Sequence, residues 1–373
     1  VYSMINNKKK ILWIGAFPPK GSDIYGGVLA ACRSLLSSRF GSEFDFSLLD
    51  STQKSNPPPR LLIRIFYSIP RAVKFFLSLL TFRPNAVLIF CGSGFGLAEK
   101  GLFAWFVRLV GIPCVMFPRG GKILRDSYHS LFWKYYAKIF FGGASVLLCQ
   151  GTHWQSFAVD VLGFKKKDTV IINNWISNPK YFGIGKARKY FPPKSKLKIL
   201  FVGWVEEGKG VFELIKACEI LAKKHEFKLF VVGDGTSKPR LLEKVNRYKL
   251  NDTVVFVGWL KGNNLLDAYR QADIFVLPTY MEGMPNVLLE AMASGLPIVT
   301  TPVGNIPDIV DDGRTGIFVP VGDAAALSEA LTSLILSESE RARLGESGFK
   351  YAQHVFDLEV ASKKMISVFR ELA

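Results

Sequence analysis

The feature that most limits how this chain can fold is a regular alternation of short apolar runs with longer helical patterns. The runs are rich in Val, Ile, Leu and Phe, which is typical of buried strands in parallel sheets built from β-α-β units. In the first half they cover residues 11–17, 44–50, 86–90, 113–117, 145–149 and 169–173. In the second half they cover residues 197–203, 227–233, 253–258, 273–278, 297–301 and 316–320. The pattern predicts an α/β protein of two doubly wound parallel sheets that face a cleft.

The length also favours two domains, because 373 residues exceed the size at which a single core usually stops growing. We expect an N-terminal domain over residues 1–182 and a second domain over residues 197–355. Residues 183–196, GIGKARKYFPPKSK, are rich in Gly, Pro and charge and are the expected linker. Residues 356–373 form an amphipathic pattern, and we expect this last helix to pack back towards the N-terminal domain.

The charge of the chain is unevenly distributed. Residues 1–180 contain 23 Lys and Arg against 8 Asp and Glu, a net charge of +15, whereas the remaining residues contain 25 against 23. The first half is therefore expected to face an anionic partner, either a nucleic acid or a lipid headgroup surface.

The five cysteines indicate a reducing compartment. They are odd in number, lie far apart in mostly apolar stretches and show no CxxC or Cys/His ligand spacing. We interpret them as reduced core residues of a cytosolic protein. The apolar run at 11–17 follows three lysines but ends in GAFPP without a small-residue cleavage site, so it is read as a first buried strand rather than a signal peptide.

Two glutamates eight positions apart mark the segment YMEGMPNVLLEAMASG. Pro285 suits the first position of a helix that runs to about Ser294 and ends at Gly295, because proline fixes a helical φ and glycine permits a left-handed one. Glu290 then lies among apolar residues of that helix, where a carboxylate needs hydrogen-bond donors such as two ribose hydroxyls. Eight positions separate Glu282 and Glu290 by roughly 12 Å along a helix. The carboxylates of a glycosidase are about 5 to 9.5 Å apart, so an extended ligand such as a nucleotide sugar suits the pair better.

This segment resembles the donor-binding motif of retaining glycosyltransferases of family 4, which have the GT-B fold. The resemblance covers most of the chain and rests on six motifs in order. They are DIYGGVLAACRSL, INNWISNPKYF, FVGWVEEGKGVFELIKA, FVVGDG, GWLKGNNLLDAYRQADIFVLPTYMEGMP with the following EAMASGLPIV, and TPVGNIPDIVDDGRTGIFVP.

The resemblance implies a role for individual residues. Lys209 would contact the donor diphosphate, Glu282 the sugar or its adjacent phosphate, and Glu290 the ribose. Gly26 and Gly27 would let the backbone of the first domain approach the transferring group. The residues expected to bind the donor are Gly26, Gly27, Gly203, Lys209, Glu282, Gly283, Met284, Pro285, Asn286 and Glu290. No DxD motif occurs, so we expect no metal or other cofactor, and cationic and amide donors would stabilise the leaving group.

The chain departs from the family pattern at two places. Family members commonly have an arginine after the Val-Gly of the phosphate loop, and this chain has Trp204. Many members have a histidine after the strand read at 113–117, where this chain has FPRGGK. Arg119 is the nearest polar substitute and joins Lys209 and Glu282 as an expected catalytic residue, and His153 is the alternative.

A basic amphipathic segment lies in the first half. Arg60, Arg64, Arg71 and Lys74 fall within a stripe of about 80° on a helix of 100° per residue, and Leu, Ile and Phe cover the remainder. Four charges argue against a conventional spanning helix, whereas cations with Phe and Leu suit a helix lying in a membrane interface. An ordinary helix packed on the sheet, with arginines reaching solvent, is the alternative. We expect these four cations to contact an anionic membrane.

The expected protein is a cytoplasmic glycosyltransferase, peripheral on the inner face of the cytoplasmic membrane. By resemblance, it uses a UDP- or GDP-linked sugar and a saccharide or lipid-linked acceptor in bacterial O-antigen, capsule or exopolysaccharide assembly. A nucleotide-sugar epimerase on the same fold is one rival. A basic nucleic-acid-binding protein is another, although no RRM, KH or helix-turn-helix pattern is visible, and we expect no nucleic-acid partner.

Overall fold

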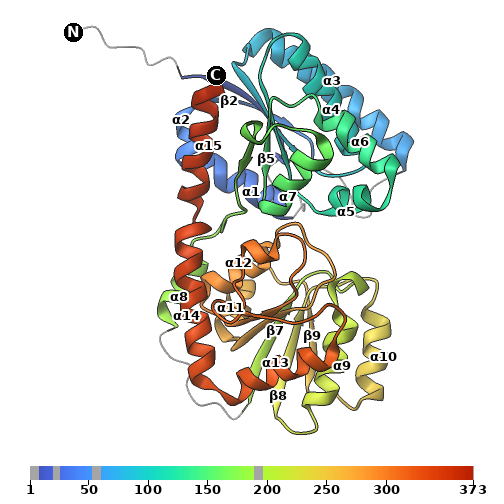
Figure 1. The fold of residues 1–373 in the computed structure, drawn as a ribbon, viewed down its shortest axis with the longest axis vertical. Coiled ribbons are helices and arrows are strands. Elements are labelled where there is room, and N and C mark those ends of the chain that lie inside the picture. The colour runs from blue at the N-terminus through green and yellow to red at the C-terminus, as the bar shows by residue number, and fades with distance from the viewer. Residues whose placement is uncertain (1–7, 20–25, 53–59, 189–195, 373) are drawn as a thin grey trace, which may run out of the picture. The chain divides into compact units, whose positions relative to one another are not determined.

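The computed structural model describes residues 8–19, 26–52, 60–188 and 196–372. Within them the chain divides into two compact units. Unit 1 comprises residues up to Ser177 together with the segment from Leu358 onwards, and unit 2 comprises Asn178–Asp357. Each unit contains one six-stranded sheet in which all pairs of strands are parallel (Figure 1). The expectation of two doubly wound α/β domains is confirmed.

Unit 1 has the strand order β2-β1-β3-β4-β5-β6. Its strands are β1 (Lys10–Gly15), β2 (Asp45–Asp50), β3 (Ala86–Cys91), β4 (Cys114–Pro118), β5 (Val146–Cys149) and β6 (Thr169–Ile171). Its helices are α1 (Gly27–Leu36), α2 (Arg39–Glu43), α3 (Leu61–Phe82), α4 (Phe95–Leu109), α5 (Lys122–His129), α6 (Leu131–Phe141), α7 (Thr152–Ser156), the π-helical η1 (Phe157–Leu162), the short η2 (Lys166–Asp168) and α15 (Leu358–Leu372).

Two apolar clusters cover the two faces of this sheet. Helices α3, α4, α6 and α7 contribute to one, which includes the stacked rings of Phe75 and Phe103. Helices α1, α2 and α15 contribute to the other, where Phe369 of α15 contacts Phe40 and Phe44. The C-terminal helix is therefore part of the unit 1 core, although 180 residues of unit 2 precede it in the chain.

Unit 2 has the strand order β12-β11-β10-β7-β8-β9. Its strands are β7 (Leu197–Val202), β8 (Phe227–Val232), β9 (Val254–Gly258), β10 (Ile274–Leu277), β11 (Ile298–Thr300) and β12 (Ile317–Phe318). Its helices are α8 (Lys180–Ala187), the short η3 (Glu207–Lys209), α9 (Val211–Leu221), α10 (Lys238–Arg247), α11 (Gly262–Gln271), α12 (Asn286–Ala293), the short η4 (Ile306–Asp308), α13 (Ala324–Leu336) and α14 (Glu338–Val355).

The two sheets reverse their direction of growth at different strands. In unit 1 the reversal lies between β1 and β3, and in unit 2 it lies between β7 and β10. In open α/β sheets a ligand site forms beyond the carboxyl ends of the strands at such a reversal, because the loops there diverge to opposite faces. Each unit therefore has one such position.

The segment expected to be the linker begins differently from the expectation. The units divide after Ser177, and residues 183–187 continue helix α8 of unit 2, while residues 189–195 lie outside the described residues. A Cβ on Gly185 would lie 2.3 Å from the backbone oxygen of Ala293, so this glycine allows α8 to pack closely on α12. Arg188 at the end of α8 donates to the backbone oxygens of Ser294, Ala272 and Tyr269 at 2.7, 2.8 and 2.7 Å.

The cysteines lie where the sequence places them. All five are buried and free, and burial raises the thiol pKa of Cys91 to about 12. Among the described residues, α3 is the helix that is long and apolar enough to cross a membrane by length and composition, and only 6% of its apolar window is buried.

Candidate functional site

The reversal point of unit 2 carries an ion pair that two separate loops supply. Lys209 lies in the loop after β7 and Glu282 in the loop after β10, and these two strands are neighbours in the sheet. The Nζ of Lys209 lies 2.5 Å from Oε1 of Glu282, and the two side chains are 24% and 16% exposed. The sequence names both residues, and the structure shows that they contact each other.

Backbone contacts fix the two loops against each other. The carbonyl of Gly208 accepts from the Tyr280 N–H at 3.0 Å and from the Thr279 hydroxyl at 3.1 Å. Gly210 has a φ of +68°, and a Cβ there would lie 1.9 Å from the Pro278 carbonyl oxygen. Only glycine fits such a position, because it combines a left-handed conformation with a backbone contact. The ion pair is therefore positioned by the backbone before any ligand arrives.

A second set of contacts holds the segment around Glu282 from the other side. Asn305 donates to the Gly283 carbonyl through its backbone N–H at 3.1 Å and its side-chain amide at 2.9 Å. Gly304 has a φ of +58°, and a Cβ there would lie 1.9 Å from the carbonyl oxygen of Glu282. Gly283, Met284 and Pro285 are buried, so they serve as the base of the loop.

Glu290 lies on α12, four residues after Asn286. This places it about 6 Å further along the helix axis than the start of the helix. Pro285 precedes the first helical residue instead of occupying it, and Gly295 follows the helix with a φ of +68°, as expected of a helix stop.

Two tyrosines surround the carboxylate of Glu290. The Tyr269 hydroxyl of α11 donates to it at 3.0 Å, and the Tyr181 hydroxyl of α8 also hydrogen-bonds to it. Burial raises the pKa of Glu290 to about 7, although both hydrogen bonds act to lower it. Two donors do not fill the lone pairs of a carboxylate, so Glu290 has capacity left for hydroxyl groups of a ligand.

Sequence reasoning did not identify these tyrosines. Tyr181 lies in the motif INNWISNPKYF, within the expected N-terminal domain of residues 1–182, and Tyr269 lies in a helix whose apolar face explains it as core. Nothing in the one-dimensional pattern brings α8, α11 and α12 together. The glycine at 185, read as linker flexibility, is the residue whose lack of a side chain makes that packing possible.

Trp204 replaces the arginine that the resemblance would place after the Val-Gly of this loop. Its ring lies 4.8 Å from that of Trp259 in an edge-to-face arrangement, and the two side chains are 42% and 48% exposed. Gly203, just before it, donates to the Val232 carbonyl at 3.0 Å. The departure thus gives an exposed aromatic pair beside β7 and β9, in place of a cation.

The other expected site residues belong to unit 1. Gly26 precedes α1 with a φ of +152°, Gly27 begins that helix, and both border a cavity at the β1/β3 reversal. The Arg119 guanidinium lies over the rings of Phe90, Phe117 and Trp175, at 5.4, 4.6 and 5.0 Å.

Burial lowers the pKa of Arg119 to about 10, and its Nη1 is buried with no hydrogen-bond partner among the described residues. The alternative, His153, stacks on Tyr128 at 5.9 Å. The catalytic role of Arg119 stays a prediction.

The four cations expected to contact a membrane are distributed differently from the expectation. Arg71 pairs with the buried Glu99 of α4 at 2.7 Å, and Arg64 lies over the Phe95 ring at 5.2 Å. Arg64, Arg71 and Lys74 all line the unit 1 cavity, while Arg60 is exposed just before α3. Arg64 and Arg71 therefore contact the protein, whereas Lys74 borders the cavity but is exposed. The remaining apolar side of α3 is also exposed. Among the described residues, no three His, Cys, Asp or Glu side chains group as metal ligands.

Comparison with known protein families gives a match in the second half of the chain. Residues 186–351 match the family model described as glycosyl transferases group 1. The chain is 31% identical over 171 residues to a capsular polysaccharide biosynthesis glycosyltransferase of Staphylococcus aureus, covering 45% of this chain and 44% of the relative. The chain spans about half the length of the curated relatives it matches.

Solved structures match nearly the whole chain. Sucrose-phosphate synthase from Thermosynechococcus elongatus has a TM-score of 0.79 at 20% identity, covering 98% of this chain and 99% of that one. Anabaena HepE in complex with UDP-glucose has a TM-score of 0.74 at 17% identity, covering 97% of this chain and 99% of that one. The fold is therefore GT-B, with two Rossmann-like domains.

Proposed function

We propose that this chain, in which residues 186–351 form a group 1 glycosyltransferase domain, transfers a sugar from a nucleotide-diphosphate donor with retention of configuration. The observation that carries the proposal is the Lys209–Glu282 ion pair at the reversal point of unit 2. A lysine held there supplies positive charge where a diphosphate would gain negative charge as the glycosidic bond breaks. Glu282 lies beside it, in position to contact the sugar or the adjacent phosphate.

Glu290 would bind the ribose of the donor. Its carboxylate is half-buried, is hydrogen-bonded by Tyr181 and Tyr269, and can accept further hydrogen bonds from two hydroxyls. The structural neighbour HepE is described in complex with UDP-glucose, which supports a nucleotide sugar as the ligand class. The exposed rings of Trp204 and Trp259 are available to contact the base.

The reaction would need no metal in this proposal. The bond between the anomeric carbon and the diphosphate oxygen breaks, and a bond to an acceptor oxygen forms on the same face of the sugar. The acceptor proton passes to the departing diphosphate oxygen, which acts as the base. Lys209 stabilises the diphosphate charge throughout.

The acceptor would be lipid-linked and reached at a membrane surface. Six side chains of α3, at spacings of three or four residues, form an exposed stripe that we call the apolar stripe: Leu62, Phe66, Ile69, Val73, Leu77 and Leu80. Leu62 and Leu80 are 80% and 72% exposed. Soluble proteins rarely expose such a contiguous apolar surface unless it binds a partner.

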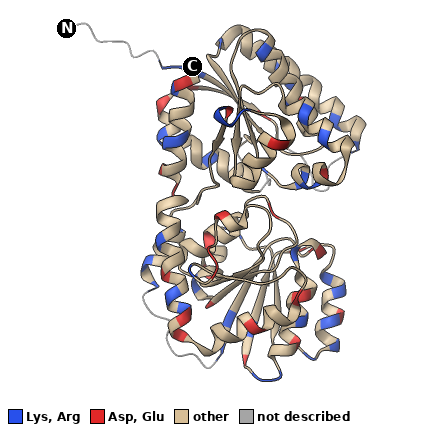
Figure 2. Ribbon diagram, viewed as in Figure 1, with Lys and Arg blue, Asp and Glu red and all other residues tan. Residues whose placement is uncertain are grey.

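A bilayer is the partner that fits the apolar stripe. Arg60 and Arg83 flank α3 at its two ends and are exposed, in position for anionic headgroups. Figure 2 shows that Lys and Arg outnumber Asp and Glu over unit 1, whereas both signs are mixed over unit 2. We therefore infer peripheral attachment through the apolar stripe of α3, with charge adding attraction to anionic lipids.

The biological setting would be bacterial surface polysaccharide assembly, such as O-antigen, capsule or exopolysaccharide, on the cytoplasmic face of the inner membrane. The capsular polysaccharide relative from Staphylococcus aureus supports this setting. No structural observation favours the epimerase or the nucleic-acid-binding alternative.

Thermal unfolding with UDP- and GDP-linked sugars tests the donor assignment, because a ligand that binds only the folded state raises the Tm. We expect a nucleotide sugar to raise the Tm of the wild type but not that of Lys209→Ala. Release of labelled sugar onto a lipid-linked acceptor then separates transfer from epimerisation. A protein that no nucleotide sugar stabilises, and that retains RNA in a salt-dependent way, would refute the proposal.

A further inference from the structure

The cavity at the β1/β3 reversal of unit 1 has a volume of about 970 Å³. Its walls come from the carboxyl ends of β1, β2 and β3, the start of α1, the loop CGSGFG and the inner side of α3. A cavity of this size accommodates a ligand of roughly the size of a drug molecule or a disaccharide. Of the residues expected to bind the donor, Gly26 and Gly27 border this cavity, whereas Lys209, Glu282 and Glu290 lie in unit 2.

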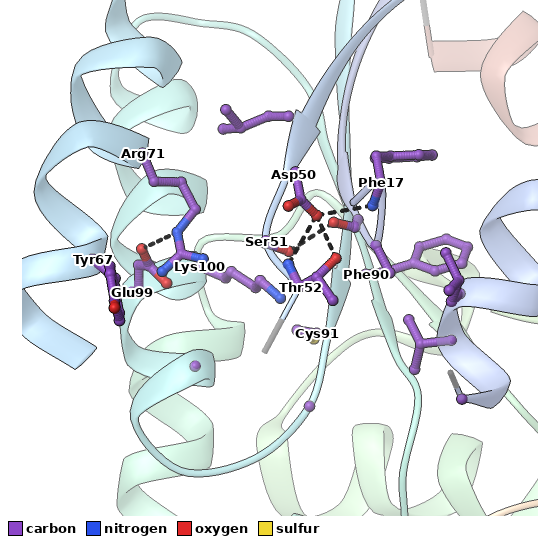
Figure 3. A pocket seen from close by; sticks show the side chains of 18 of the residues that line it. Phe17, Asp50, Ser51, Thr52, Tyr67, Arg71, Phe90, Cys91, Glu99 and Lys100 are labelled. Atoms are coloured by element: carbon purple, nitrogen blue, oxygen red, sulfur yellow. Dashed lines mark hydrogen bonds and ion pairs between the residues drawn. The ribbon is translucent and has the colours of Figure 1, made fainter. Parts of the chain in front are cut away.

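Cations outnumber acids among the cavity residues. Four of the charged side chains are basic and two are acidic: Arg64, Arg71, Lys74 and Lys100 against Asp50 and Glu99. Both acids are already engaged. Glu99 pairs with Arg71 at 2.7 Å. Asp50 accepts from the Phe17 N–H at 2.9 Å, the Thr52 N–H at 3.0 Å and the Thr52 hydroxyl (Figure 3).

Lys100 is the cation with the strongest need for a ligand. It comes from α4, and its side chain extends across the cavity towards Thr52 and Cys91 (Figure 3). Within the described part of the chain, neither Lys100 nor Lys74 forms a hydrogen bond or an ion pair. Burial lowers the pKa of Lys100, and the nearby Arg71 charge acts in the same direction. A bound anion would relieve both effects.

The loop CGSGFG gives an anion access to the backbone. Gly92 and Gly96 border the cavity, and a Cβ built on either of them would meet nothing within 4 Å. The loop leads into α4, whose first turn contributes a partial positive charge to the same region. This glycine-rich loop thus borders the basic cavity.

The basic cavity and the apolar stripe are two sides of one helix. At 100° per residue, the mean direction of Arg64, Arg71 and Lys74 differs from that of the apolar stripe by about 150°. A ligand with a phosphate in the cavity and a hydrocarbon chain along α3 would satisfy both sides at once. A soluble phosphate compound would leave the stripe uncovered.

We propose that this cavity binds the phosphate of an amphiphilic acceptor through Lys100, Lys74 and Arg71, while the lipid chain leaves past α3 into the bilayer. The proposal rests on the proposed function, because it identifies the acceptor as a lipid phosphate or diphosphate. It assigns a binding role to three cations that the sequence places at the membrane surface or does not single out.

Vesicle flotation without any nucleotide sugar tests this site independently of the donor site. The probes are phosphatidylcholine vesicles that contain either polyprenyl phosphate or the uncharged polyprenol. We expect the wild type to bind the phosphate vesicles more tightly, and Lys100→Met to lose about tenfold of that affinity, the effect of one charge-assisted contact. Lys74→Ala should reduce it by a smaller factor.

Lys167→Met is the matched control, because Lys167 is exposed in η2 of the same unit and does not line the cavity. It should bind like the wild type, and circular dichroism should show that all variants fold. Phosphate-vesicle binding by Lys100→Met that equals the wild type overturns the site. If inorganic pyrophosphate alone binds the protein as tightly as the phosphate vesicles do, the lipid part of the proposal is overturned. Failure of the donor thermal shift, with vesicle binding intact, would instead count against the proposed function.

Discussion

The reversal points of the two sheets have the same topological origin and opposite electrostatic states. In unit 2, Lys209 and Glu282 neutralise each other at 2.5 Å, and two left-handed glycines lock the loops that hold them. In unit 1, a cavity of about 970 Å³ contains a lysine with no partner among the described residues. In unit 2 the Glu282 carboxylate already neutralises Lys209, so an anionic ligand would take its place beside the lysine. In unit 1 the cations outnumber the acids, so an anionic ligand would neutralise the excess positive charge. The comparison indicates that a parallel sheet fixes where a ligand goes, and the loops fix its chemistry.

Removing the cation of unit 2 should give the largest effect. Lys209→Ala deletes the charge opposite the leaving diphosphate and leaves Glu282 unpaired, so sugar transfer should fall by about 100-fold or more. Labelled-sugar transfer at saturating acceptor measures it. Lys216→Ala on the neighbouring α9 removes an exposed lysine and is the control. Equal activities of the two variants would show that the cation at the reversal point of unit 2 has no special role in transfer.

Glu290→Gln should mainly affect donor binding. The amide keeps the shape of the side chain but replaces a carboxylate acceptor, so the Kd for the nucleotide sugar should rise about tenfold. Calorimetric titration with UDP and GDP sugars gives this value directly. Binding of polyprenyl phosphate vesicles should be unchanged, and a parallel loss there would show that the two sites are not separate.

Changes in the apolar stripe should weaken vesicle binding by unit 1 and leave donor binding by unit 2 unchanged. Phe66→Ser with Leu77→Ser removes two large exposed side chains, and vesicle binding should weaken by about tenfold or more, because each fully buried side chain contributes about 1.5–3 kcal/mol. Donor binding should stay at the wild-type value. Co-sedimentation with anionic vesicles measures the first and thermal shift the second. Undiminished co-sedimentation would contradict membrane contact through α3.

The pH dependence of stability should reveal Glu290. Its pKa is about 7 in the folded protein against 4.5 as the ordinary value, so between these values the folded state holds a proton that the unfolded state has lost. This contribution is fully present below pH 4.5 and is lost as the pH rises towards 7. The Tm of the ligand-free wild type should therefore fall more across that window than the Tm of Glu290→Gln. Identical slopes would contradict the raised pKa.

Tyr269→Phe should have the smallest effect. It removes one of the two tyrosine hydroxyls at Glu290, and an unmade hydrogen bond of this kind costs about 1 kcal/mol of stability. The same change should raise the pKa of Glu290 further, because the lost hydrogen bond favours the charged form. Urea denaturation and the pH profile of donor binding measure the two consequences. A pH profile equal to that of the wild type would show that Tyr181 alone sets the pKa of the Glu290 carboxylate.

The sequence predicts the positions of the strands better than it predicts which side of a helix packs against the protein. All twelve strands are found within a few residues, because a buried parallel strand is apolar throughout and needs no register information. The side of α3 that faces solvent was harder to predict. Its basic stripe is visible at helical spacing, yet which side turns inward depends on Glu99 and Phe95 of a different helix, as the Arg71 ion pair shows.

The candidate site divides in the same way. Lys209, Glu282 and Glu290 could be named because each lies in a short motif with its own chemistry. The tyrosines at Glu290 could not, because three helices distant in the sequence meet there. Gly185 and the residues that follow it suggested a linker, and the structure instead uses Gly185 for close packing and Arg188 for hydrogen bonds to the backbone of unit 2.

Helix α15 has a consequence for the order in which this protein can fold. Phe40 and Phe44 find their Phe369 partner only in a helix that follows unit 2 in the sequence, whereas unit 2 is one continuous stretch from Asn178 to Asp357. During synthesis the ribosome therefore completes the second unit first, although it begins the first one earlier. Until α15 has been made, the nascent first unit keeps an uncovered aromatic surface, which is where a chaperone would be expected to act.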